Sequence, residues 1–138
     1  MRLETTFSID TSSIKYGPGV TKEVGFEMNR LGAKRIMILT DKRLSKSESV
    51  QTVIDSLSSE GLDAQLYDQV RVEPTDVSFK DAIEFATTGR FDGYVALGGG
   101  STIDTAKAAA LYDTYPNDFL TYVNAPIGQG KPVPGPLK

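Results

Sequence analysis

Short apolar runs alternate with helical stripes along most of the chain, and this alternation constrains the fold more than any other feature. Three runs have the length and composition of buried strands: Arg35–Leu39, Ala64–Tyr67 and Tyr94–Leu97. Four segments space their apolar residues as amphipathic helices do: 20–31, 50–57, 76–89 and 102–111. Strands that alternate with helices are joined by right-handed crossovers and pair in parallel. The sequence therefore predicts a Rossmann-like, doubly wound α/β fold with a mostly parallel sheet between two helical layers.

Turn-forming residues set the expected limits of these elements. Glycines stand where three of the helices should end: Gly32, Gly61 and Gly89. Asp76 is in position to cap the third helix. Near the start, Phe7 and Ile9 alternate with polar residues, as do Ile14 and Tyr16 after a polar turn, which predicts an N-terminal β-hairpin. Residues 124–138 are rich in proline and glycine, so we expect a domain over 1–123 followed by a Pro/Gly-rich tail.

The composition excludes several classes of function. The chain has no cysteine and no histidine, which excludes disulfides and thiolate chemistry and removes the commonest metal ligand and general base. The net charge is −3 and no basic run occurs, so nucleic acid is not an expected partner. No apolar stretch reaches the ~20 residues that span a bilayer. The first residues lack the apolar run of a secretory signal, so a cytoplasmic protein is expected, without a recognisable organellar leader.

The strongest chemical signal is the turn after the third strand, Gly98-Gly99-Gly100-Ser101, hereafter the glycine turn. Glycines let the backbone approach a ligand closely, and the following helix directs free N–H groups and its positive dipole end into the turn. This arrangement suits a phosphate or pyrophosphate. The dinucleotide GxGxxG pattern does not fit, because position 103 is Ile103, and no Walker A motif is present. The alternative is a plain tight strand-to-helix turn.

Three charged residues near the strand ends complete the candidate site. Ser101 and Asp104 have the spacing of a capping box, which would fix the start of the fourth helix. Lys107 is either a ligand contact or a surface partner of Asp104. Asp41 follows the first strand, where a carboxylate can accept hydrogen bonds from an adenosine ribose and repel a 2′-phosphate. Its alternative role is an ordinary turn or helix cap.

Ligands of doubly wound sheets bind beyond the carboxyl ends of the strands. The segments that follow the three predicted strands are therefore the informative ones: Thr40–Lys42, Val70–Thr75 and Gly98–Asp104.

Taken together, four segments resemble the iron-containing alcohol dehydrogenase family: Tyr16–Val20, Arg35–Asp41, Pro74–Thr75 and Phe91–Lys107. The most specific part is Gly-Gly-Gly-Ser-x-x-Asp-x-x-Lys, and the nearest likeness is to the hydroxyacid–oxoacid transhydrogenase branch. The resemblance implies NAD-linked oxidation of primary alcohols or hydroxyacids, with NADP less favoured. It also implies that Gly98 to Ser101 bind the pyrophosphate, that Asp104 lies beside the nicotinamide end, and that Asp41 favours NAD.

The sequence also departs from that family. The resemblance implies an iron site built from one aspartate and three histidines of a helical domain, and this sequence contains neither that domain nor any histidine. We therefore expect no family metal in this chain, and low or no activity from it alone. One alternative is a non-catalytic domain that forms homo-oligomers through surface left exposed. Another is a minimal dehydrogenase whose metal is held by carboxylates: Asp10, Asp92, Asp104 or Asp113.

Overall fold

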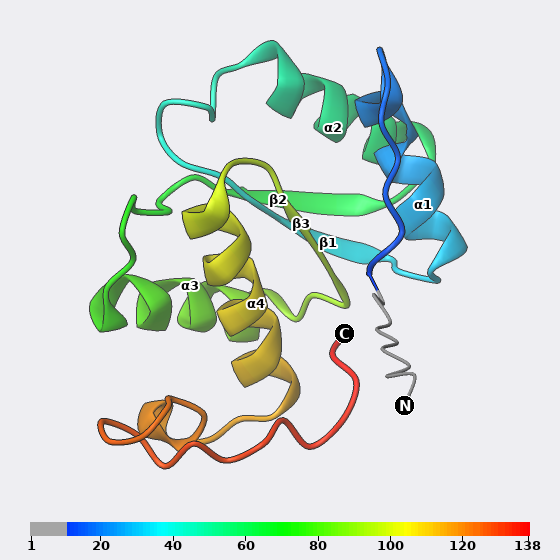
Figure 1. Cartoon of the computed structure of the whole chain (residues 1–138). Coiled ribbons are helices and arrows are strands. Elements are labelled where there is room, and N and C mark those ends of the chain that lie inside the picture. Colours follow the sequence, from blue (N-terminus) through cyan, green and yellow to red (C-terminus); the bar gives the residue numbers. More distant parts are fainter. Residues whose placement is uncertain (1–10) are drawn as a thin grey trace, which may run out of the picture.

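The computed structural model describes residues 11–138 and has an α/β architecture. Its parallel sheet has the order β2-β1-β3 and consists of β1 (Arg35–Leu39), β2 (Asp63–Tyr67) and β3 (Gly93–Ala96). The α-helices of this part of the chain are α1 (Val24–Arg30), α2 (Glu48–Ser59), α3 (Asp76–Gly89) and α4 (Gly100–Thr114). Two 3-10 helices, η1 (Val20–Glu23) and η2 (Phe119–Thr121), precede α1 and follow α4. Helices α1 and α2 cover one face of the sheet, and α3 and α4 cover the other (Figure 1). The predicted three-layer, Rossmann-like fold is confirmed.

Strand β1 lies at the centre of the sheet and is buried on both faces. Ile36 and Ile38 pack into the core beneath α1 and α2, while Met37 and Leu39 pack into the core beneath α3 and α4. All four are at most 1% exposed. Side chains alternate between the faces of a strand, so a continuous apolar run is what a strand covered on both sides requires.

Helices α1 and α2 approach each other so closely that backbone touches backbone. The Gly25 N–H donates to Ser56 Oγ over 2.8 Å, and that hydroxyl donates in turn to the Lys22 carbonyl over 2.7 Å. A Cβ added at Gly25 would lie 2.1 Å from the Ser56 carbonyl oxygen. The absence of a side chain at Gly25 therefore sets the spacing of this helical layer.

The element ends follow the turn residues, with two differences. Gly32 and Gly61 have positive φ values of 84° and 72°, as expected of residues that end helices. Gly89 is the last residue of α3, and Arg90 takes the left-handed conformation with φ 53°. The cap of α3 is Thr75 and not Asp76. Thr75 has an extended backbone and exchanges two hydrogen bonds with Ser78, forming a capping box.

The predicted N-terminal hairpin is not formed where the structure can test it. Its first strand, around Phe7 and Ile9, lies outside the described residues. Residues 11–16, which include its second strand, have no regular structure. Ile14 and Tyr16 are 81% and 100% exposed, so a strand in this segment would not be stabilised by burial of its apolar side chains.

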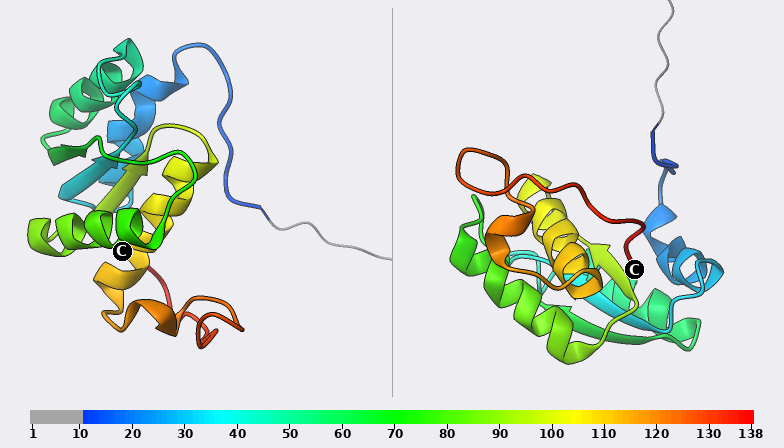
Figure 2. Two further views of the ribbon diagram at one scale, coloured as in Figure 1. Left: turned by 90° about the vertical axis from the view of Figure 1, so that its left-hand side faces the viewer. Right: turned by 90° about the horizontal axis from the view of Figure 1, so that it is seen from below.

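The C-terminal segment returns along the layer formed by α3 and α4 (Figure 2). The ring of Phe119 stacks on Tyr112 with a centroid distance of 5.5 Å and lies 6.4 Å from the ring of Phe79. Main-chain bonds close residues 120–131 into a loop, and Lys138 pairs with Asp113 over 2.9 Å. These contacts cross the predicted domain limit between residues 123 and 124, which stays a prediction.

The left-handed residue after α3 offers a test of backbone strain. Replacing Arg90 by glycine removes the Cβ from an αL position, so we expect the free energy of unfolding to rise by about 1 kcal/mol. Chemical denaturation measures the change. Arg90→Ala is the matched control, because alanine loses the same charge and keeps the Cβ. An equal gain in both variants would mean that the charge, and not the backbone, is responsible.

The contact between α1 and α2 gives a second test. Gly25→Ala should destabilise the chain by about 2–3 kcal/mol, because the added methyl overlaps the Ser56 carbonyl. Gly99→Ala is the control, since a Cβ at that glycine meets nothing within 4 Å and its φ of −89° suits alanine. Thermal unfolding of both variants decides the matter. If Gly25→Ala unfolds like the native sequence, the close helix packing described here is wrong.

Candidate functional site

The three segments that follow the strands meet at one residue, Thr40. Its N–H donates to the Tyr67 carbonyl over 2.9 Å, and its own carbonyl accepts the Val70 N–H over 3.2 Å. Its hydroxyl donates to the Leu97 carbonyl over 2.8 Å. Thr40 is fully buried and therefore joins the carboxyl ends of all three strands.

Within the glycine turn, the three glycines have different surroundings. At Gly98 a Cβ would lie 2.4 Å from Thr102 Oγ1, so this glycine is required by the packing of the turn on α4. At Gly99 and Gly100 a Cβ would meet nothing within 4 Å. The fold itself leaves open space above these two residues.

The beginning of α4 presents unused hydrogen-bond donors to that space. The Gly99 carbonyl accepts the N–H groups of Thr102 and Ile103, at 3.0 and 3.1 Å, which starts the helix. Within the described chain, the N–H groups of Gly100 and Ser101 donate to no protein acceptor. First-turn N–H groups and the positive end of the helix dipole attract anions, so the turn fits a phosphate group.

The predicted capping box of Ser101 and Asp104 is wrong. Gly99 is the N-cap of α4 and uses no side chain, which places Ser101 inside the first turn. The Ser101 hydroxyl instead accepts the N–H of Glu73 over 3.2 Å, and so fastens the segment after β2 to the glycine turn. Glu73 has a φ of 56°, a strained conformation for a residue with a side chain.

Asp41 combines a structural role with a free acceptor. Its Oδ1 accepts the N–H groups of Arg43 and Leu44, at 2.8 and 3.0 Å, which is the turn-capping alternative. Its Oδ2 has no hydrogen-bond partner in the described residues. Asp41 also lines a groove of about 500 Å³ between the ends of β1 and β2 and the start of α3, with three cationic neighbours: Lys42, Arg43 and Arg71.

Asp104 and Lys107 lie exposed on α4, and no ion pair joins them in the part of the chain that the structure describes. Their predicted surface salt bridge is therefore absent, and both charges remain available on the helix that carries the glycine turn.

Carboxylates that could hold a metal are far apart. Asp92 lies at the amino ends of the strands and accepts the N–H groups of Lys34 and Arg35. Burial raises its pKa, but these backbone bonds outweigh the burial, so the pKa lies below the usual value. Asp104 and Asp113 are separated by about 13 Å along α4. Over residues 11–138 no group of three potential ligands gathers, and Asp10 lies outside that range.

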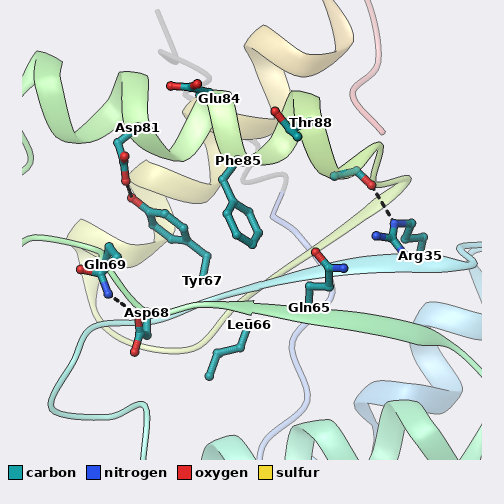
Figure 3. A pocket seen from close by; sticks show the side chains of 11 residues that line it. Arg35, Gln65, Leu66, Tyr67, Asp68, Gln69, Asp81, Glu84, Phe85 and Thr88 are labelled. Carbon is teal, nitrogen blue, oxygen red and sulfur yellow. Dashed lines mark hydrogen bonds between the residues drawn. The ribbon is translucent and has the colours of Figure 1, made fainter.

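A second groove, of about 700 Å³, lies next to the groove beside Asp41, between the outer edge of β2 and α3 (Figure 3). Its floor is aromatic, with Tyr67 and Phe85 at a centroid distance of 5.3 Å. The Tyr67 hydroxyl donates to Asp81 over 2.6 Å, and burial together with this bond raises the pKa of the phenol. This groove shares Tyr67, Gln69 and Asp81 with the groove beside Asp41, and no residue of the glycine turn lines either groove. We place the candidate site at the strand ends because the unused N–H donors of the glycine turn lie there.

The sequence indicated Asp41, the glycine turn and the segments that contain Thr40, Lys42 and Arg71. It did not predict the hydrogen bonds of Thr40 or the bond between Glu73 and Ser101. A threonine directly after a buried apolar run was the available signal for Thr40. In the described residues, no helix is long and apolar enough to cross a membrane.

The comparisons with known proteins identify the family of this chain. The sequence profile of iron-containing alcohol dehydrogenases matches residues 11–137. A mouse protein named hydroxyacid-oxoacid transhydrogenase, mitochondrial, is 61% identical over 133 residues, which cover 96% of this chain and 29% of the mouse protein. The human protein of that name is 58% identical, over 96% of this chain and 28% of the human protein. The chain thus spans less than a third of these relatives.

The expectation of a cytoplasmic protein is wrong. It rested on the lack of an apolar run near Met1 and of a bilayer-spanning stretch. The mouse and human relatives are named as mitochondrial proteins, and this finding overturns it.

Solved structures share the fold. NADH-dependent butanol dehydrogenase A from Thermotoga maritima matches with a TM-score of 0.76 and 26% identity, over 83% of this chain and 29% of that one. An alcohol dehydrogenase from Oenococcus oeni matches with a TM-score of 0.70 and 31% identity, over 75% of this chain and 28% of that one. The profile, the relatives and the fold agree, and the chain belongs to the iron-containing alcohol dehydrogenase family.

Proposed function

We propose that this chain is the dinucleotide-binding part of an oxidoreductase that uses NAD, in preference to NADP, to oxidise primary alcohols or hydroxyacids. The observation that carries the proposal is the glycine turn, where open space lies above unused N–H donors at the start of a long helix. The name of the Thermotoga relative includes NADH, and the names of the mammalian relatives include hydroxyacid as a substrate class. The first name fits this site, and the second supports the substrate class of the proposed reaction.

The residues divide the binding between them. The N–H groups of Gly99, Gly100 and Ser101 would donate hydrogen bonds to the pyrophosphate oxygens, and the positive end of the α4 dipole would favour the two negative charges of the pyrophosphate. Gly98 allows the turn to lie against Thr102 and keeps these donors close to the strand. Lys107, two helical turns into α4, would add a positive charge to the same anion.

Asp41 would bind the adenosine ribose of the dinucleotide. Its Oδ1 is occupied by the turn, and its Oδ2 is available to accept hydrogen bonds from ribose hydroxyls. The carboxylate charge would also repel a 2′-phosphate, which gives a preference for NAD. Asp104, one turn after the glycine turn, would lie toward the nicotinamide end, as the family resemblance implies.

The bound nicotinamide supplies hydride transfer, and this chain supplies binding and orientation. The family's iron does not fit this chain. The sequence has no histidine, and the described residues gather no cluster of carboxylates. Among residues 11–138, no metal-ligand cluster is present to polarise an alcohol oxygen or stabilise an alkoxide. We therefore propose cofactor binding with little or no turnover by this chain alone.

A second candidate function is self-association into a homo-oligomer without catalysis. The outer edge of β3 borders an apolar groove of about 750 Å³, lined among others by Phe26, Met28, Val95 and Leu97. The outer edge of β2 is also without a neighbouring strand in the described residues. Apolar grooves and open strand edges favour contacts between chains. Light scattering tests this candidate, and a monomer at high concentration would contradict it.

Titration with NADH tests the glycine turn. Gly99→Val should abolish saturable binding detected by calorimetry, because its side chain fills the space above the donors. Gly99→Ala is the graded control and should weaken binding by about tenfold. Both variants should unfold close to the native temperature, since a Cβ at this position meets nothing within 4 Å. Undiminished binding by Gly99→Val would place the dinucleotide elsewhere.

A substitution at Asp41 tests the preference for NAD over NADP. Asp41→Asn should keep the turn, since an amide oxygen accepts the same two N–H groups, while the charge is lost. We expect NADH affinity to fall about tenfold and NADPH affinity to rise, helped by Lys42, Arg43 and Arg71. Parallel fluorescence titrations with the two cofactors measure the ratio. A ratio unchanged from the native chain would remove Asp41 from the ribose site.

A further inference from the structure

We propose that the Thr40 hydroxyl is a positioning group that holds the glycine turn in the orientation needed to bind a dinucleotide pyrophosphate. Thr40 is fully buried, so it acts through the backbone and not by touching the ligand. This inference rests on the proposed function, and it adds the residue that sets the geometry of the binding turn.

The first step is how the Leu97 peptide is held. Leu97 follows the last residue of β3, and its N–H still donates to the Leu39 carbonyl over 2.9 Å. In a continuing parallel ladder, the Leu97 carbonyl would accept the N–H of Asp41. It accepts the Thr40 hydroxyl instead, over 2.8 Å. A side chain thus replaces the next main-chain bond of the ladder.

Because of this replacement, the segments after β1 and β3 leave the sheet at neighbouring positions. The Asp41 backbone is free to enter its own turn, where the Asp41 carbonyl accepts the N–H of Ser45 over 2.9 Å. The Leu97 carbonyl nevertheless stays satisfied inside the protein. The orientation of the peptide that leads into Gly98 is therefore set by one hydroxyl.

The glycine turn has few other restraints. Gly99 caps α4 without a side-chain bond, and glycines have the widest backbone freedom of all residues. On the far side, the turn is fastened through Ser101 to the N–H of Glu73. On the strand side, the Thr40 hydroxyl is the only side-chain hydrogen bond that the described residues make to the Leu97 peptide. Loss of this bond should let the donors of the turn sample other orientations.

The test compares three variants. Thr40→Val replaces the hydroxyl by a methyl group of similar size and leaves the main-chain bonds of Thr40 to Tyr67 and Val70 in place. Thr40→Ser keeps the hydroxyl and removes the methyl group. Thr121→Val is the matched control, because Thr121 is also buried, at 2% exposure, and its hydroxyl donates to Asn117 far from the strand ends.

The readouts are calorimetric titration of the whole chain with NADH and the amide NMR signals of the glycine turn, both at a temperature where every variant is folded. We expect Thr40→Val to bind NADH about tenfold more weakly, as the loss of one buried hydrogen bond implies. Thr40→Ser and Thr121→Val should bind like the native chain. Without ligand, the amide signals of residues 98–101 should shift or broaden in Thr40→Val alone.

Native binding by Thr40→Val would overturn the inference, as would Thr40→Ser binding as weakly as Thr40→Val, because packing would then matter and not the hydroxyl. If the native chain itself fails to bind NADH, the proposed function fails, and the amide signals still decide the inference. Signals of residues 98–101 that are unchanged in Thr40→Val would overturn it.

Discussion

Burial of β1 on both faces is the constraint on which the rest of the structure depends. Four consecutive side chains, Ile36 to Leu39, are almost fully enclosed, and each contributes about 2 kcal/mol of hydrophobic free energy. Such a strand needs a helical layer on each side and a neighbouring strand on each edge. The order β2-β1-β3 and the assignment of α1 and α2 to one face and α3 and α4 to the other satisfy both needs. The strand ends are thereby brought together, and the candidate site follows from the core.

Enclosure of β1 has a consequence for polar groups where the strand ends. The end of β1 is buried away from water, so every carbonyl and N–H group there still needs a hydrogen-bond partner within the protein. At the centre of the sheet, Thr40 supplies these partners. Its N–H donates to the Tyr67 carbonyl at the end of β2, and its hydroxyl donates to the Leu97 carbonyl just after β3. Stability and site geometry share these bonds, so the two properties are coupled at this position.

Much of the fold could be predicted because its signals are local. Apolar runs, helical spacing and the glycines at positions 32 and 61 act within a few residues, and each predicted its element correctly. The errors arose where a partner is distant in sequence. Ser101 is spaced like a capping residue, but it is engaged by Glu73, 28 positions earlier. The segment around Ile14 alternates like a strand, yet in the described residues no neighbour covers it.

The glycines separate what the fold requires from what a ligand requires. At Gly25, Gly93 and Gly98 a side chain would collide with the protein, so packing alone explains these residues. Gly99 and Gly100 differ, because a Cβ there would meet empty space and neither has a φ that excludes other residues. Glycine at a helix start also lowers stability relative to residues that restrict the unfolded chain. Packing therefore does not require glycine at these two positions, and the proposed dinucleotide, which would approach the backbone closely beside unused N–H donors, would account for them.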